Sequence, residues 1–165
     1  ASGIGHPIIG LDHLAVLIAA GVRAAALPVG GGVLAVLAFV FGGFAGSLLH
    51  VAGIGLGPVE ALVALTVLVA GVALLRRRLP TALLPIAFAV AGLFHGHAFA
   101  EAIIGAEQGP LVAYLAALAL TQAAIGLGAM ILARRFGSRL PQLRPVTGVC
   151  AAVLGGLFLA MALVA

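Results

Sequence analysis

Six long apolar stretches follow one another along the chain, separated by short clusters of polar residues. They cover approximately residues 7–22, 32–49, 58–75, 80–102, 110–133 and 145–164. A transmembrane helix needs about 20 mostly apolar residues, because the hydrocarbon core is roughly 30 Å thick and each helical residue rises about 1.5 Å. No ten-residue alternation of polar and apolar positions favours a membrane β-barrel. The pattern therefore predicts an all-α integral membrane protein with a bundle of about six transmembrane helices.

Prolines mark the expected starts of most of these helices. Five of the six stretches begin at a proline, namely Pro7, Pro58, Pro80, Pro110 and Pro145. Proline suits the first helical turn, where the N–H that it lacks has no partner within the helix. No composition shift or polar linker divides the chain, so we expect residues 1–165 to form a single transmembrane domain.

The composition strengthens the membrane assignment. Hydrophobic residues make up 64% of the chain and charged residues 7%, and the mean hydropathy is +1.35. These values exclude an ordinary water-soluble domain and predict the lipid bilayer as a partner. The only cysteine, Cys150, lies in an apolar stretch, so the chain cannot form an intrachain disulfide.

The positive charges predict the orientation in the membrane. All eight are arginines in alternate loops, at Arg23, Arg76, Arg77, Arg78, Arg134, Arg135, Arg139 and Arg144. The positive-inside rule makes these loops cytoplasmic and places both termini outside. The same rule accounts for the net charge of +4, so we expect no nucleic-acid partner. The chain begins with Ala, as after removal of a signal peptide, and we expect a bacterial inner-membrane protein.

The acidic and histidine residues collect at the opposite, periplasmic side, and the first group lies in the first stretch. His6 and His13 are seven residues apart, so they fall on nearly the same face of a helix at about 100° per residue. Asp12 is one residue away and would either join a metal site or orient an imidazole. A second interpretation is that Asp12 stabilises a helix N-terminus and the histidines lie at the lipid interface.

The second group lies at the outer end of the fourth stretch, in the segment Phe-His-Gly-His-Ala-Phe-Ala-Glu. His97 and Glu101 are four residues apart and share a helical face. His95 and His97 point to nearly opposite sides of a regular helix. Either these two histidines serve different sites, or a local break at Gly96 turns both inward. A third interpretation without a metal is one buried histidine hydrogen-bonded to a carbonyl and one histidine facing a loop. Two groups near one membrane face favour a metal site, since ionisable residues inside membranes are costly and usually functional.

Other polar residues have a weaker claim to function. His50, Glu60 and Glu107 are expected to lie in solvated outer loops, at most as an attracting rim around the site. Thr121 and Gln122 form the only adjacent polar pair in the middle of the fifth stretch, and we expect them to make interhelical hydrogen bonds.

The two groups together resemble the motifs of the HupE/UreJ family of membrane nickel-uptake proteins. The resemblance rests on His6 with Asp12-His13, and on Phe94-His95-Gly96-His97-Ala98 with Glu101, within an apolar six-span plan that covers essentially the whole chain. It implies that His6, Asp12, His13, His95 and Glu101 bind metal, and the spacing adds His97. It also implies a removable signal peptide. One departure from the family pattern is Ala100, where relatives are expected to carry Gly.

The leading hypothesis is a permease that takes up a divalent transition metal through an outward-facing His/Asp/Glu site. Imidazole and carboxylate ligands suit Ni, Zn, Co or Cu(II), so nickel is implied by the family and not by the ligands. The alternatives are an intramembrane metalloenzyme and an accessory metal-binding membrane protein. No His-Glu-x-x-His motif or nucleophile pairing favours an enzyme, and no catalytic cofactor is expected. A homo-oligomer is left open.

Overall fold

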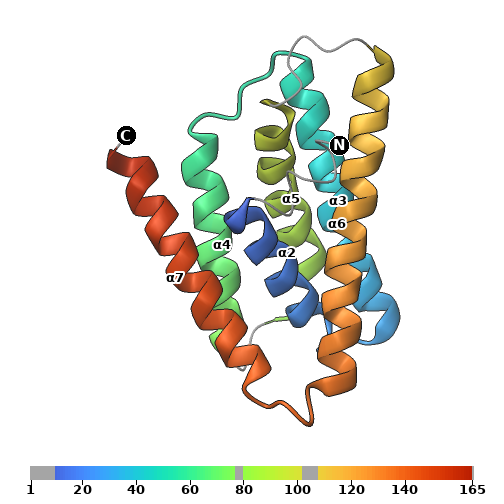
Figure 1. Cartoon of the computed structure of the whole chain (residues 1–165), viewed down its shortest axis with the longest axis vertical. Helices are drawn as coiled ribbons and strands as arrows, with labels where there is room; N and C mark the ends of the chain where they lie inside the picture. Colours follow the sequence, from blue (N-terminus) through green and yellow to red (C-terminus); the bar gives the residue numbers. More distant parts are fainter. Residues whose placement is uncertain (1–9, 77–79, 102–107, 165) are drawn as a thin grey trace.

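The computed structural model describes residues 10–76, 80–101 and 108–164. These residues form six α-helices in up-and-down order and no strand, which confirms the all-α prediction for the part of the chain described (Figure 1). The helices are α2 (Leu11–Ala24), α3 (Val29–Val51), α4 (Val59–Leu75), α5 (Leu84–Ala100), α6 (Gln108–Phe136) and α7 (Leu143–Val164).

Three of the described helices are long and apolar enough to cross a membrane: α3, α6 and α7. The apolar helices α4 and α5 are shorter, with 17 residues each. Large apolar side chains cover the outside of the bundle, for example Phe41, which is 70% exposed, and Leu120, which is 72% exposed. Such a surface suits lipid tails and not water. The number of membrane crossings and the side on which the termini lie remain predictions.

The start of α5 differs from the expectation based on Pro80. The helix begins at Leu84, and Pro85 occupies its first turn. A helix beginning at residue 80 would place Pro85 in the second turn, where a backbone N–H has to reach the carbonyl four residues earlier. Proline has no N–H, so the helix starts later, and the Leu84 N–H bonds the Thr81 carbonyl in a preceding turn. At α4 the expectation holds, since Pro58 directly precedes the helix.

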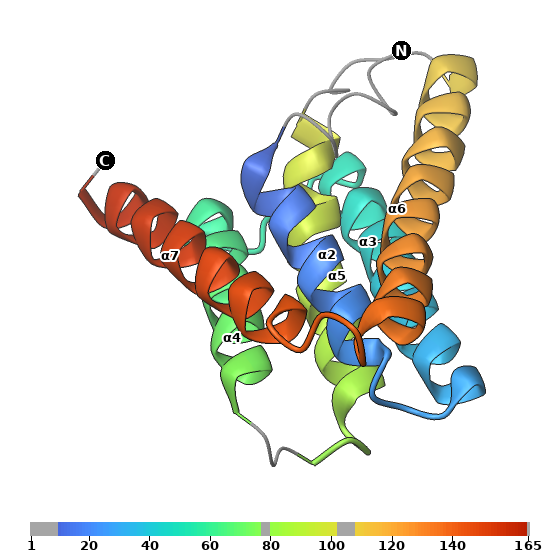
Figure 2. The same cartoon turned by 60° about the horizontal axis from the view of Figure 1, so that its bottom comes forward.

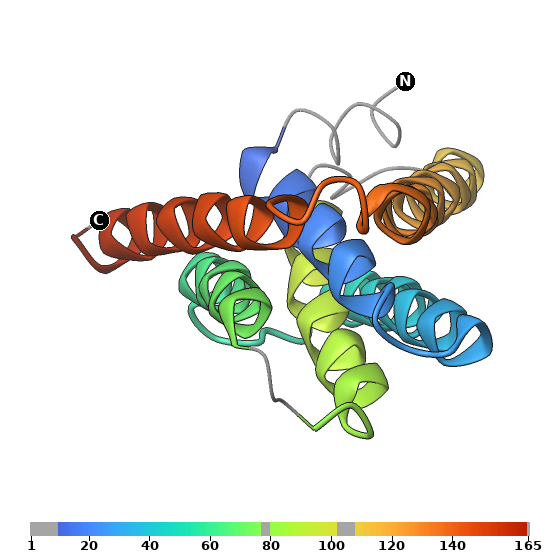
Figure 3. The ribbon, with the colours of Figure 1, turned by 90° about the horizontal axis from the view of Figure 1, so that it is seen from below.

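Helix α2 lies in the middle of the bundle and packs against α3, α4, α6 and α7 (Figures 2 and 3). Four of the other helices form two close pairs around it, α3 with α5 and α4 with α7, and α6 packs against α2 and α3. Most of the residues of α2 from Val16 to Ala24 are buried, and Val16 and Leu17 are each only 2% exposed. Asp12 and His13 belong to the first turn of this central helix, and they therefore lie near both pairs.

Glycines bring the backbones of α3 and α5 into contact. A Cβ atom added at Gly96 would collide with the Gly43 carbonyl, and one at Gly92 would collide with the Phe39 carbonyl. Small residues permit such close approach where lipid supplies no hydrophobic force between helices. The contact is reinforced by Ser47, whose buried hydroxyl donates to the Gly96 carbonyl at 2.8 Å. This interface fixes the helical turn that carries the histidines on either side of Gly96.

Two of the described arginines, Arg134 and Arg144, make contacts that tie neighbouring elements together. Arg144 at the start of α7 donates from Nε to the Leu74 carbonyl at 2.8 Å and from Nη2 to the Arg76 carbonyl at 2.6 Å. Arg134 near the end of α6 bonds the Leu27 carbonyl in the loop between α2 and α3. The predicted gathering of these loops at one end of the bundle is thus present. Arg77 and Arg78 lie outside the described residues.

Candidate metal-binding site

A pair of histidines joins the start of α2 to the end of α5. The Nδ1 atoms of His13 and His95 lie 2.6 Å apart, although 82 residues separate the two in sequence. The ring centroids are 4.8 Å apart in an edge-to-face arrangement. His95 is fully buried and His13 is 7% exposed. Both imidazoles therefore lie inside the protein and not in a surface loop.

Aromatic rings surround this pair. The ring of Phe99 packs on His13 with centroids 4.0 Å apart, and the ring of Phe39 lies 5.6 Å from that of His95. Phe99 is also held through its backbone, because the Tyr114 hydroxyl donates to its carbonyl at 2.8 Å. Because these neighbours limit the ring orientations, the imidazoles are held in fixed directions by packing as well as by hydrogen bonds.

A chain of hydrogen bonds assigns the protons of the neutral pair. The Thr66 hydroxyl donates to the Val63 carbonyl at 2.7 Å, so its oxygen is left to accept from His95 Nε2–H at 2.9 Å. His95 Nδ1 then carries the lone pair and accepts from His13 Nδ1–H. The remaining nitrogen of His13, Nε2, carries its lone pair. A ring nitrogen whose partner nitrogen is fixed in this way is prepared to bind a metal.

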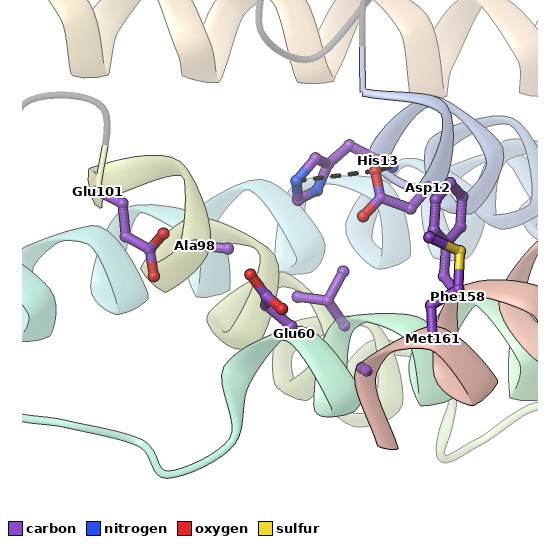
Figure 4. Close-up of a pocket in the computed structure, with 9 residues that line it drawn as sticks. Asp12, His13, Glu60, Ala98, Glu101, Phe158 and Met161 are labelled. Atoms are coloured by element: carbon purple, nitrogen blue, oxygen red, sulfur yellow. Dashed lines mark hydrogen bonds and ion pairs between the residues drawn. The ribbon is translucent and has the colours of Figure 1, made fainter. Parts of the chain in front are cut away.

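A pocket of about 410 Å³ opens beside His13 and carries three carboxylates. Asp12 comes from α2, Glu60 from the first turn of α4, and Glu101 from the end of α5 (Figure 4). Asp12 Oδ1 accepts a hydrogen bond from the His13 backbone N–H at 2.8 Å and lies 4.0 Å from His13 Nε2. The other lining residues are Val63, Ala98, Phe158, Met161 and Ala162. The pocket thus places oxygen ligands beside an imidazole.

His97 belongs to a different place from His95. Helix α5 continues through Gly96 without a break, so the two histidines leave it in nearly opposite directions. His97 Nδ1 lies 3.2 Å from Nδ1 of His50, at the end of α3, and its Nε2–H donates to the Ile54 carbonyl at 3.0 Å. The local break considered from the sequence is therefore absent, and His95 and His97 contact different neighbours. His97 and Glu101 share a helical face but face different neighbours.

The predicted ligands do not all meet in one cluster. His6 and Glu107 lie outside the described residues. Within residues 10–76, 80–101 and 108–164, no three His, Cys, Asp or Glu side chains are close enough to hold one metal ion. The described candidate residues instead form a histidine pair next to a carboxylate-lined pocket, with a second histidine pair elsewhere. A metal ion bound by several of these side chains would require them to move together, or would keep water ligands.

The sequence prediction assigned Glu60 to a solvated loop and did not consider Thr66. Glu60 was expected in a solvated loop, yet it belongs to α4 and lines the pocket. Thr66, the partner of His95, is the only polar residue in the long apolar part of α4, and that isolation is the signal that could have found it. The expectation for Thr121 was wrong, since its hydroxyl bonds the Ala117 carbonyl of its own helix. Gln122 is 1% exposed, and its Nε2 has no partner among the described residues.

Comparison with known proteins agrees with the motifs. The profile described as HupE / UreJ protein matches residues 1–158. Protein HupE of Rhizobium leguminosarum bv. viciae is 31% identical over 163 residues, which cover 96% of this chain and 83% of that protein. No solved structure matches the chain. Because the family profile spans nearly the whole sequence, and the relative is similar over most of its length, the chain belongs to the HupE/UreJ family.

Proposed function

We propose that this protein is a permease that captures a divalent transition-metal ion in the carboxylate-lined pocket beside His13 and passes it inward. The observation that carries the proposal is a single pocket lined by His13 and three carboxylates, those of Asp12, Glu60 and Glu101, in which Asp12 Oδ1 lies 4.0 Å from His13 Nε2. Membership in a family associated with nickel uptake makes nickel the first candidate. Nitrogen and oxygen ligands are equally compatible with Zn, Co and Cu(II).

Each side chain has a role that follows from its position. The carboxylates of the pocket would attract a cation and offset part of its charge as it loses water. His13 Nε2 would bind the ion directly. His95 would orient His13 through the Nδ1 contact, and would become a second ligand if the two rings separated. His6 and Glu101 remain proposed ligands from the sequence motifs, and His97 is considered separately below.

The position of the pocket in the bundle suits entry from outside. It lies at the start of α2 and α4 and at the end of α5, whereas Arg23, Arg76 and Arg144 lie at the other ends of their helices. By the positive-inside rule the arginine end faces the cytoplasm. An ion entering from the periplasmic side would therefore meet the carboxylates first. Labile coordination by imidazole, carboxylate and water suits a transporter, because the ion must also leave.

Uptake into liposomes tests this function directly. Purified protein would be reconstituted, and entry of Ni²⁺ would be followed with an indicator trapped inside. We expect uptake by the unaltered chain, loss in His13→Ala and in His95→Ala, and unchanged uptake in Thr147→Val. Thr147 is a suitable control because its hydroxyl bonds only the Leu143 carbonyl of α7 in the described structure.

The same assay separates the competing functions. Unchanged uptake in both histidine variants would contradict the assignment of the pocket. Ni²⁺ binding without any uptake by the unaltered chain would indicate an accessory role. Metal-dependent turnover of a lipid or peptide without uptake would indicate an intramembrane metalloenzyme.

A further inference from the structure

The second histidine pair repeats the arrangement of the first with a different separation. His50 stands in the last turn of α3 and His97 in the last turn of α5, and their Nδ1 atoms face each other at 3.2 Å. The ring planes are nearly perpendicular, at 85°, with centroids 4.4 Å apart. His97 is 4% exposed, whereas His50 is partly exposed. One imidazole is therefore fixed inside the bundle and the other borders the surface.

A hydrogen bond to the backbone determines which ring nitrogen of His97 carries the lone pair. The Ile54 carbonyl can only accept, so His97 Nε2 must donate to it at 3.0 Å. In the neutral ring this leaves the lone pair on Nδ1, directed at His50. Metal-binding histidines commonly donate their other ring N–H to a backbone carbonyl in just this manner. His97 therefore already has the tautomer and orientation of a ligand.

The separation of the two nitrogens fits a shared metal ion. Two nitrogens that each lie about 2.0–2.1 Å from one metal are roughly 2.9–3.4 Å apart for angles between right-angled and tetrahedral. The His50–His97 distance of 3.2 Å lies in this range, and the His13–His95 distance of 2.6 Å does not. The nitrogen–nitrogen distance at the second pair is therefore already that of two ligands of one ion. At the first, the rings would have to separate.

From this geometry we infer that His50 and His97 form a second binding site for a divalent first-row transition-metal ion, distinct from the pocket at His13. The identity of the ion rests on the proposed uptake function, but the site itself rests on the pair. Binding moves the His50 proton from Nδ1 to Nε2, so both Nδ1 atoms become ligands and water completes the coordination. Two protein ligands bind an ion weakly, which suits a site on the outer side where ions exchange rapidly.

Variants at His50 separate a metal-binding role from a simple hydrogen bond. In His50→Asn the side-chain amide can still donate to His97 Nδ1 but is a poor ligand for these ions. In His50→Asp the carboxylate can bind a metal but cannot donate when ionised. His50 borders the surface, so these changes are less disruptive than changes at His97. Thermal unfolding of each metal-free variant in detergent would verify that it folds.

The experiment counts Ni²⁺ ions bound to the purified chain by equilibrium dialysis. We expect two ions per unaltered chain, one in His50→Asn, two in His50→Asp with altered affinity at one site, and one in His13→Ala. Cobalt bound to the His13→Ala variant should show visible absorption that disappears when His50→Asn is added. An ion count that stays the same in all His50 variants would overturn the second site.

The two proposals fail separately in this experiment. If the unaltered chain binds one ion that is lost in His13→Ala but kept in His50→Asn, the second site is wrong and the pocket stands. If the single ion is lost in His50→Asn but kept in His13→Ala, the second site stands and the pocket does not bind Ni²⁺. A chain that binds none overturns both.

Discussion

Nδ1 of His95 accepts a hydrogen bond from Nδ1–H of His13 at 2.6 Å, and this contact makes the two histidines unequal. His95 is buried, and its other ring nitrogen, Nε2, donates to the Thr66 hydroxyl. The Nε2 atom of His13 instead lies on the side of Asp12. The contact with His95 therefore limits the orientation of the His13 ring. The two histidines therefore differ in their surroundings, although each belongs to one of the two sequence motifs.

Thr66 is the first test of this inequality. Thr66→Val removes the acceptor for His95 Nε2–H while keeping the shape of the side chain. The His95 tautomer is then no longer fixed. Because His95 acts on the ion only through His13, we expect Ni²⁺ affinity to fall by up to about tenfold, the lower end of the range for direct outer partners of metal-binding histidines. Titration calorimetry of the purified protein measures the change.

Thr66→Ser provides the matched control for that experiment. Serine keeps a hydroxyl that can accept from His95 and donate to Val63. It should retain most of the affinity. Equal affinities in the valine and serine variants would show that the hydroxyl has no part in orienting the pair.

Glu60 tests whether the pocket, and not only the sequence motifs, attracts the ion. Glu60→Gln removes one of three lining carboxylates without changing the size of the side chain. Because Coulomb attraction near a protein surface is modest, we expect the apparent affinity for Ni²⁺ uptake to fall by about fivefold to tenfold. Initial uptake rates at several Ni²⁺ concentrations would show this change, and Glu60→Asp, which keeps the charge, should lose less. If Glu60→Gln takes up Ni²⁺ normally, the carboxylate only borders the pocket.

The apolar pattern was sufficient to predict the helices because it records burial and lipid exposure directly. All six predicted stretches correspond to described helices, and most boundaries agree within a few residues. At the start of α5 the prediction took Pro80 as the first residue, whereas the helix begins at Leu84 with Pro85 in its first turn. Both prolines can begin a helix, but a helix that includes both has to lose a backbone hydrogen bond.

The pairing of the histidines could not be predicted from the sequence. Helical periodicity placed His95 and His97 on opposite sides of one helix, as the structure has them. It could not say which helix each would face, because that depends on how α5 crosses α3 at Gly92 and Gly96. For the same reason His50 was set aside as a loop residue, although it lies in α3 and meets His97.

Arg144 should contribute to stability at the arginine end. It donates to the carbonyls of Leu74 and Arg76 at the end of α4, which otherwise have no partner within that helix. Arg144→Gln should lower the free energy of unfolding by about 1–2 kcal/mol, since these bonds carry a charged donor. Unfolding in mixed detergent micelles would measure it. Arg139→Gln, which removes an equal charge from an exposed residue at the same end, should have a smaller effect. Equal losses would assign the effect to net charge.

Gly96 links the helix packing to both histidine pairs, and it gives the strictest test of the site geometry. An alanine Cβ at this position would collide with the Gly43 carbonyl, so α3 and α5 would have to separate. We expect Gly96→Ala to cost about 1–3 kcal/mol of stability, as other overpacked substitutions do. It should also weaken Ni²⁺ binding, because His95 and His97 lie on either side of the displaced turn. Gly156→Ala in α7 has open space around its Cβ and should leave both properties unchanged. A Gly96→Ala variant with normal stability and binding would mean that the two helices do not approach as closely as described.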